Sequence, residues 1–294
     1  MGSGLQAQTV REAISEVTKR FRAARLVYGH GTTGPHEEAA WIVLHACKLP
    51  FEALEEAGSR VLSNPERRRV DTLAARRIRE RIPAAYLIHE AWLGDFRFYV
   101  DRRVIVPRSY IAEILDDGIG TFLASPVKTA LDLCTGSGCL AILLAHAFPA
   151  ARIDAVDLSK AALAVAKRNI DAYDLGRRLH AIHSDLFQSM GNRRYDLIVS
   201  NPPYVNAVSM KRLPREFLAE PRMALAAGSD DLTIVRRILA SARRHLKPRG
   251  VLVCEIGHNR KVLEQAFPEL PFIWMETSAG DGLVFLIEKD HLPA

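Results

Sequence analysis

Residues 129–145 read TALDLCTGSGCLAILLA, and this stretch decides the fold class. An apolar strand at 129–133 runs into a glycine-rich turn at 134–138, and an apolar helical run follows. In a strand-turn-helix unit of this kind, the backbone N–H groups of the turn can approach a bound cofactor closely. The stretch therefore predicts the cofactor-binding corner of an α/β sheet.

A second strand follows at 152–156 and ends at Asp157, about 20 residues beyond the glycines. An acidic side chain at that point can accept hydrogen bonds from both ribose hydroxyls of an adenosine cofactor. The glycine run is shorter than that of a dinucleotide site, and no P-loop lysine follows it. We therefore favour S-adenosylmethionine over NAD or ATP.

The stretch YDLIVSNPPY at 195–204 carries the chemistry. Pro202 and Pro203 have no backbone N–H group, so the corner after this strand offers hydrogen-bond acceptors only. The side-chain carbonyl of Asn201 and the main-chain carbonyl of Pro202 can each accept one hydrogen of a planar –NH2 group, with the ring of Tyr204 against its face. The pattern predicts methylation of a weakly nucleophilic nitrogen, although the same residues also form ordinary stiff turns.

The remaining sequence divides into three parts. Helical spacing at 10–21, 37–47 and 65–81 predicts an N-terminal helical substrate-recognition domain at 1–84. Apolar runs at 86–88 and 96–100 predict a β-hairpin linker within 85–108, followed by an α/β domain at 109–294. That domain should contain a mainly parallel sheet with an antiparallel edge, because helical and strand segments alternate and two strands close the chain. The loop at 205–230 is long enough to be a lid or binding surface.

Charge is concentrated at the N-terminus. Residues 1–108 hold 18 Lys and Arg against 13 Asp and Glu. Part of this excess is a basic stretch that could contact phosphate or an acidic partner, or simply form a solvated helix face. It consists of Arg67, Arg68, Arg69, Arg76, Arg77, Arg79 and Arg81. No aromatic residues interleave with it, so sequence-specific reading of nucleic acid is not implied.

Composition is that of a cytoplasmic globular protein, with 48% hydrophobic and 25% charged residues. No apolar run reaches the ~18 residues that a membrane span requires. The four cysteines show no C-x-x-C pairing, so neither a metal site nor a disulfide framework is expected.

Together these motifs resemble the HemK-type protein-glutamine N5-methyltransferases, which are Rossmann-like class I S-adenosylmethionine enzymes. The resemblance spans residues 83–288. The segments that carry it are Val106–Ser109, Asp132–Gly138, Asp157, Ser184–Phe187, Asn201–Tyr204 and Glu220–Leu225.

The resemblance implies roles for individual residues. The turn should surround the methionine part of the cofactor, Asp157 should hold its ribose, and Asp185 with Leu186 should flank its adenine. Asp132 should orient the turn or reach the methionyl ammonium. Arg108, Ser109 and Glu113 either belong to a linker that closes over the cofactor or form an ordinary helix start with Ser109 as its N-cap. The cofactor-binding set is Asp132, Cys134, Thr135, Gly136, Ser137, Gly138, Asp157, Asp185, Leu186 and Asn201. The acceptor set is Asn201, Pro202, Pro203 and Tyr204, of which Asn201, Pro202 and Tyr204 are the catalytic candidates.

The family has two bacterial branches, which modify a large-subunit ribosomal protein or the GGQ glutamine of release factors. Residues 106–109 and the cysteine of the glycine-rich turn favour the ribosomal branch. The expected partner is then a ribosomal protein, free or in a precursor bound to ribosomal RNA, and the oligomeric state is left open. An adenine-N6 or other amino-group nucleic-acid methyltransferase would present the same two hydrogens to the corner. A noncatalytic, S-adenosylmethionine-binding ribosome-assembly factor is the remaining alternative.

Overall fold

The computed structural model describes residues 5–117, 119–205, 207–226 and 231–293. The chain forms two compact units. The N-terminal unit comprises Met1–Ala91 together with Leu213–Ala219. The second unit comprises Trp92–Arg212 together with Glu220–Ala294 and is named the catalytic unit here because it contains the predicted catalytic candidates. A short piece of the chain that follows the Asn-Pro-Pro-Tyr corner is therefore built into the N-terminal unit.

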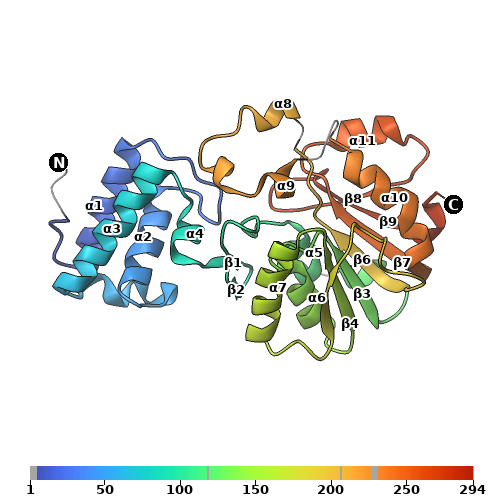
Figure 1. Cartoon of the computed structure of the whole chain (residues 1–294), viewed down its shortest axis with the longest axis horizontal. Coiled ribbons are helices and arrows are strands. Elements are labelled where there is room, and N and C mark those ends of the chain that lie inside the picture. Colours follow the sequence, from blue (N-terminus) through green and yellow to red (C-terminus); the bar gives the residue numbers. More distant parts are fainter. Residues whose placement is uncertain (1–4, 118, 206, 227–230, 294) are drawn as a thin grey trace. The chain divides into compact units, whose positions relative to one another are not determined.

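The N-terminal unit is helical, as the sequence predicts (Figure 1). Its helices are α1 (Val10–Ala23), α2 (Pro35–Ala46), α3 (Asn64–Glu80) and α4 (Ala84–Ile88), with 3-10 turns η1 (Phe51–Leu54) and η2 (Glu56–Ser59). Capping boxes start α1 and α3: the hydroxyls of Thr9 and Ser63 accept backbone N–H groups of Glu12 and Glu66, whose carboxylates accept in return.

The predicted strand at 86–88 is wrong, because this segment is the last part of α4. Pro83 stands immediately before the helix, and His89 ends it in a left-handed conformation with φ 57°. All five residues of α4 are buried, so the apolar run that suggested a strand is a buried helical turn instead. The hairpin itself is formed by β1 (Ala91–Leu93) and β2 (Phe96–Phe98).

A buried ion cluster stands inside the N-terminal unit. The guanidinium of Arg77, which is fully buried, donates to the Glu38 carboxylate at 2.7 Å and to the Val27 carbonyl at 3.0 Å. Glu216 accepts from Arg81 and from the Val27 N–H, both at 3.2 Å, and lies 3.6 Å from Arg77. Burial raises the pKa of Glu38. Burial alone would also raise that of Glu216, but the Val27 N–H and the nearby arginines outweigh it and lower the pKa.

The basic stretch of α3 is thus largely occupied by partners within the protein. Arg77 and Arg81 belong to the buried cluster, so they are not free to contact phosphate. Arg76 and Arg79 pair with Glu80, and Arg69 donates to the carbonyl of Ala46 at 2.8 Å. Sequence spacing alone could not reveal this, because it does not show which acids lie opposite each arginine.

The catalytic unit is built on a seven-stranded sheet in the order β5-β4-β3-β6-β7-β9-β8. Neighbouring strands pair in parallel from β5 to β7, and β9 is antiparallel to both β7 and β8. This confirms the parallel sheet with an antiparallel edge. The strands are β3 (Thr129–Leu133), β4 (Arg152–Asp157), β5 (Leu179–His183), β6 (Tyr195–Ser200), β7 (Leu246–Glu255), β8 (Ile273–Met275) and β9 (Val284–Glu288).

Helices cover both faces of this sheet. One face packs with α10 (Thr233–His245) and α11 (Arg260–Ala266) in a core that includes Leu133, Ile198 and Phe285. Helices α5 (Ile111–Asp117), α6 (Cys139–Ala147) and α7 (Lys160–Ala172) pack against other parts of the sheet; Figure 1 shows α6 and α7 beside β3 and β4. The arrangement is the doubly wound, Rossmann-like fold that the alternating pattern predicts.

The loop at 205–230 contains short helical segments where the structure describes it. These are α8 (Ala207–Met210), the 3-10 turn η4 (Phe217–Ala219) and α9 (Arg222–Leu225). Residues 206 and 227–230 of the predicted lid lie outside the described residues. None of the described helices is long and apolar enough to cross a bilayer.

The buried cluster makes a stability prediction. Arg77→Met keeps most of the side-chain volume but leaves Glu38 and Glu216 without their buried partner, so we expect a loss of about 3–5 kcal/mol in the free energy of unfolding. Arg68→Ala, an exposed change on the same helix, serves as the control and should shift it by less than about 0.5 kcal/mol. Urea unfolding followed by circular dichroism measures both. Equal midpoints for the two variants would contradict the assignment.

Candidate active site

The predicted site segments lie at one edge of the sheet. Parallel pairing aligns Leu133 with Val156 on one side and with Ser200 on the other, so β3, β4 and β6 end level with one another. The Ser200 hydroxyl also donates to the Leu133 carbonyl at 2.9 Å. The glycine-rich turn, Asp157 and the Asn-Pro-Pro-Tyr corner each follow one of these strand ends. Open α/β sheets bind their ligands at this edge.

The glycine-rich turn needs residues that accept a positive φ. Cys134, Gly136 and Gly138 have φ values of 62°, 56° and 81°. A Cβ on Gly138 would come within 3.1 Å of the Ala166 Cβ, so only glycine allows α7 to pack this closely at the start of α6. At Gly136 a Cβ would meet nothing within 4 Å. The turn is therefore closely packed at Gly138 and open at Gly136.

Asp132 fixes the glycine-rich turn through hydrogen bonds to its side chain. Its side chain is fully buried, and one carboxylate oxygen, Oδ2, accepts from the Thr135 hydroxyl at 2.5 Å and from the Ala141 N–H at 3.0 Å. Burial raises the pKa of Asp132 to about 7. The other oxygen, Oδ1, has no hydrogen-bond partner among the described residues. A buried acceptor without a partner is costly, so Oδ1 is suited to receive a donor from a ligand.

Asp157 joins the turn to the second strand. Its Oδ2 accepts from the Gly136 N–H at 2.9 Å, and its Oδ1 accepts from the Ser159 N–H at 2.8 Å. Burial raises the pKa of this carboxyl, although both backbone donors oppose the shift. The Thr135 N–H donates to the Val156 carbonyl at 2.9 Å and completes the connection. Asp157 is thus fixed beside the glycine-rich turn.

The predicted adenine-flanking pair follows β5. Leu186 is buried and has a positive φ of 50°. The Asp185 carboxylate accepts from Arg237 at 2.8 Å and from the Gln188 side chain at 3.3 Å. Arg237 of α10 therefore already occupies one oxygen of Asp185, and sequence spacing could not reveal this partner because it lies 52 residues away.

The Asn-Pro-Pro-Tyr corner is held mainly through Tyr204. The carbonyl of Tyr204 accepts from the Asn259 side chain at 3.2 Å, and its ring lies against Gly257. A Cβ on Gly257 would come within 2.7 Å of a ring carbon, and Gly257 has φ 56°, so both space and backbone conformation require glycine there. Burial raises the pKa of the Tyr204 hydroxyl above its usual range. The ring therefore has one well-defined position.

Glu255 connects the corner to the linker, and the sequence analysis missed it. This residue, only 2% exposed, accepts from the Ser109 hydroxyl at 2.6 Å and from the Tyr110 N–H at 3.0 Å. Its other oxygen accepts from the Tyr204 hydroxyl at 3.4 Å. Burial raises the pKa of Glu255, while the Ser109 hydroxyl opposes that shift. The signal available in the sequence was an acid followed by Ile-Gly directly after the apolar run of β7.

A second buried acid ties the linker to the loop beyond the corner. Glu220 forms two hydrogen bonds with the Arg108 guanidinium, at 2.6 and 2.8 Å, and accepts from the Val106 N–H at 3.0 Å. The N–H of Val205 donates to the Leu225 carbonyl at 2.9 Å. Two motifs more than 100 residues apart in the sequence are thereby joined.

The structure also places Glu113, which the sequence analysis predicted, and Asn169, which it missed. Glu113, expected in the linker, accepts from the backbone and hydroxyl of Ser278, both at 2.7 Å, on the exposed surface. Asn169 of α7, which the sequence analysis did not select, donates to the carbonyls of Ser137 and Tyr99 at 2.8 and 3.1 Å. It supports the glycine-rich turn from α7. No group of three metal-ligating side chains occurs within the described ranges.

Curated proteins similar to this chain share one description. It is 52% identical over 286 residues to the ribosomal protein uL3 glutamine methyltransferase of Neisseria meningitidis, covering 97% of this chain and 94% of that protein. It is 51% identical to the enzyme of the same description from Burkholderia pseudomallei, covering 98% and 96%. The chain belongs to the ribosomal protein uL3 glutamine methyltransferase family. Residues 112–230 also match the model of the methyltransferase small domain.

Solved structures support the fold of this family member. A methyltransferase from Pyrococcus furiosus superposes with a TM-score of 0.50 at 17% identity, covering 67% of this chain and 90% of that one. The hMettl16 catalytic domain, in complex with a 3′UTR hairpin, superposes with a TM-score of 0.53 at 18% identity, covering 79% and 83%. At this identity the similarity concerns the fold alone.

The tight contact at Gly257 gives a second prediction. Gly257→Ala should displace the Tyr204 ring and lower the rate of methyl transfer by at least roughly 10-fold, because a reacting group held slightly out of line loses much of its rate. Gly191→Ala is the matched control, since Gly191 has φ 55° but open space around its Cβ position. Single-turnover rates compare the two variants. Equal rates would mean that the position of Tyr204 does not matter.

The raised pKa of Asp132 predicts a pH effect on stability. Because the fold raises its pKa from 3.8 to about 7, the folded protein holds more protons than the unfolded chain between these values. This contribution is complete below pH 3.8 and is lost as the pH rises towards about 7. Asp132→Asn cannot titrate, so its melting temperature relative to the unchanged protein should rise across that window and level off above it. Scanning calorimetry at several pH values measures the difference; parallel curves would contradict the pKa shift.

Proposed function

We propose that this chain methylates the side-chain amide nitrogen (N5) of a glutamine in ribosomal protein uL3, using S-adenosylmethionine. The observation that carries the proposal is 52% identity to a uL3 glutamine methyltransferase over nearly the whole of both chains. The Asn201–Tyr204 corner provides acceptors suited to an –NH2 group. The corner suits any of the three amino-group substrates, and it is the identity to uL3 glutamine methyltransferases that favours the ribosomal protein over a release factor or an adenine base.

The residues around the glycine-rich turn fit the proposed cofactor. Asp132 has a buried Oδ1 without a partner in the described part of the chain, and it can accept the methionyl ammonium. The open space at Gly136 leaves room beside the turn, and Asp157 can accept ribose hydroxyls. Leu186 provides a buried apolar side chain for the adenine. When bound, S-adenosylmethionine supplies an electrophilic methyl group on a sulfonium sulfur.

The corner would align the acceptor nitrogen. An amide nitrogen is a poor nucleophile because its lone pair is delocalised into the carbonyl. The carbonyl oxygens of Asn201 and Pro202 would hold its two hydrogens, direct the nitrogen towards the methyl carbon, and stabilise the positive charge that develops on it. The Tyr204 ring, fixed by Gly257 and Asn259, would lie against the amide plane. The methylated nitrogen is acidic enough to lose its proton afterwards, so no dedicated base is needed.

Two variants test the two halves of this site. Asn201→Ala should leave cofactor affinity in place and lower single-turnover methylation roughly 100- to 1000-fold, because one preorganised acceptor is lost. Asp157→Ala should weaken cofactor binding by about 1.5–3 kcal/mol. Calorimetry with S-adenosylmethionine and intact-mass measurement on unmethylated uL3 separate the effects, and each variant is the control for the other. Near-normal turnover in Asn201→Ala would refute the acceptor site.

The same mass assay tests the substrate. Unmethylated uL3, a release factor and DNA are incubated in parallel with labelled cofactor. Label on a uL3 glutamine is expected. Label on the release factor alone would keep the chemistry and change the substrate, whereas label on adenine alone would overturn the proposed function.

A further inference from the structure

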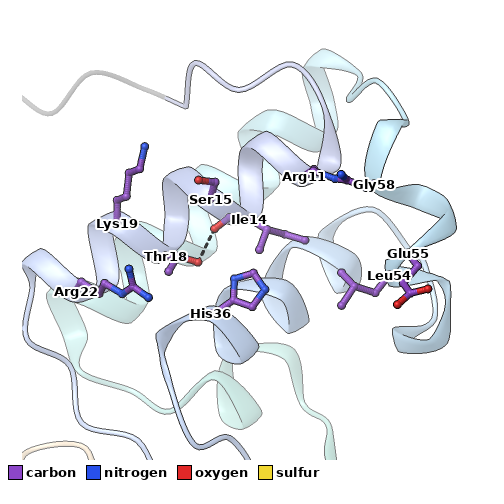
Figure 2. A pocket seen from close by; sticks show the side chains of 10 residues that line it. All are labelled: Arg11, Ile14, Ser15, Thr18, Lys19, Arg22, His36, Leu54, Glu55 and Gly58. Carbon is purple, nitrogen blue, oxygen red and sulfur yellow. Dashed lines mark hydrogen bonds between the residues drawn. The ribbon is translucent and has the colours of Figure 1, made fainter.

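A groove lies on the N-terminal unit, between α1, the start of α2 and the turns η1 and η2 (Figure 2). Its volume is about 450 Å³. Arg11, Lys19 and Arg22 of α1 line it, and Figure 2 shows His36 and Leu54 across from that helix. None of these residues belongs to the site described above.

The cations follow one side of α1. Arg11, Ser15, Lys19 and Arg22 are spaced by four, four and three residues, so they share one helical face, and all four are exposed. From Arg11 to Arg22 this row spans roughly 16 Å at 1.5 Å per residue. The opposite face, with Val17 and Phe21, is buried in the bundle.

The charges of this row are not neutralised within the described parts of the chain. Arg11, Lys19 and Arg22 form no ion pair there, in contrast to Arg20, which pairs with Asp71 at 2.7 Å. The two acids of α1 are occupied by backbone groups. Glu12 accepts from the N–H groups of residues 8 and 9, and Glu16 accepts from those of residues 6 and 7. The groove lining therefore contains three strong cations and one carboxylate, Glu55.

The large apolar side chains that line the groove are Ile14 and the half-buried Leu54. Ile14 is only 4% exposed, and the hydroxyl of Thr18 is occupied by donating to the Ile14 carbonyl at 2.7 Å. Gly58 leaves room for Arg11, because a Cβ there would come within 2.9 Å of a guanidinium nitrogen. Peptide recognition commonly depends on several apolar anchors, whereas Leu54 is the one large apolar side chain of this lining that is more than marginally exposed. An extended polyanion matches its row of cations better.

We propose that this groove binds the phosphate backbone of RNA without reading its sequence. No Phe, Tyr or Trp side chain lines it and His36 supplies its one ring, so it has no series of rings on which successive bases could stack, while the three cations can neutralise successive phosphates. The inference rests on the proposed function in one respect: it applies where the ribosomal-protein substrate reaches the enzyme in a precursor bound to ribosomal RNA. Holding that RNA would raise the local concentration of the substrate.

Fluorescence anisotropy with a labelled 20-nucleotide oligouridylate tests the groove in the full-length protein. The groove variant combines Arg11→Ala, Lys19→Ala and Arg22→Ala. The control variant combines Arg67→Ala, Arg68→Ala and Arg79→Ala, which removes the same charge from α3, at two exposed positions and at the half-buried Arg67. We expect the groove variant to raise Kd at least roughly 10-fold and to lower the slope of log K against log salt by about 2, since each phosphate contact contributes about 0.7 on single strands.

The outcomes are distinct. An equal loss of RNA affinity in the two variants would show that only the net charge matters, and it would overturn the proposal that the groove binds RNA. Ser15→Glu adds a negative charge to the row without removing a cation, and unchanged RNA affinity in this variant would also overturn it. A polyglutamate peptide that binds the unchanged protein but not the groove variant, while RNA binding persists, would assign the groove to an acidic protein instead.

A methylation assay on the same variants distinguishes a failure of the groove proposal from a failure of the proposed function. At saturating concentrations of isolated uL3 the groove variant should keep the single-turnover rate of methyl transfer, because its three substitutions lie outside the catalytic unit. Normal RNA binding with no methylation by the unchanged protein would refute the proposed function only. Normal methylation with RNA binding equal in the groove variant and the unchanged protein would refute the groove only.

Discussion

The buried carboxylate of Glu255 is the interaction on which the organisation of the site depends. It stands at the end of β7 and accepts from Ser109 and Tyr110 of the linker and from the Tyr204 hydroxyl of the corner. A buried acid is tolerated only where hydrogen bonds replace water, so these three donors are mutually dependent. The position of the acceptor corner is consequently set by β7 and the linker as much as by β6, which carries it.

The sequence was sufficient for the fold and for the segments that meet at the sheet edge. Strand-turn patterns at 129–138 and 195–204 are local signals, and parallel pairing brings such segments together without further information. The sequence was insufficient for residues that act through distant contacts. Asn169 and Gly257 matter because of what lies opposite them, and 86–88 looked like a strand because burial on all sides obscures helical spacing.

In the N-terminal unit, too, the number of basic residues in a helix differs from the number that are not already paired within the protein. The most arginine-rich helix, α3, directs Arg77 into the interior and pairs Arg76 and Arg79 with Glu80. Helix α1 contains fewer cations, but its two acids accept hydrogen bonds from the preceding backbone. Arg11, Lys19 and Arg22 therefore form no ion pair with an acid of their own helix. Electrostatic attraction depends on unpaired charge, so the number of basic residues in a helix does not by itself show which charges a partner could meet.

The path of the chain after Tyr204 has a consequence for how this protein can be divided. The polypeptide leaves the catalytic unit after Arg212, contributes Leu213–Ala219 to the N-terminal unit, and returns at Glu220. Glu216 is anchored by Arg81 and the Val27 N–H, and Glu220 by Arg108. A catalytic fragment that begins at the linker would therefore release the anchor of Glu216 and loosen the segment that leaves the acceptor corner. In evolutionary terms, the N-terminal unit cannot be exchanged as an independent module, because part of it is encoded within the catalytic half of the gene.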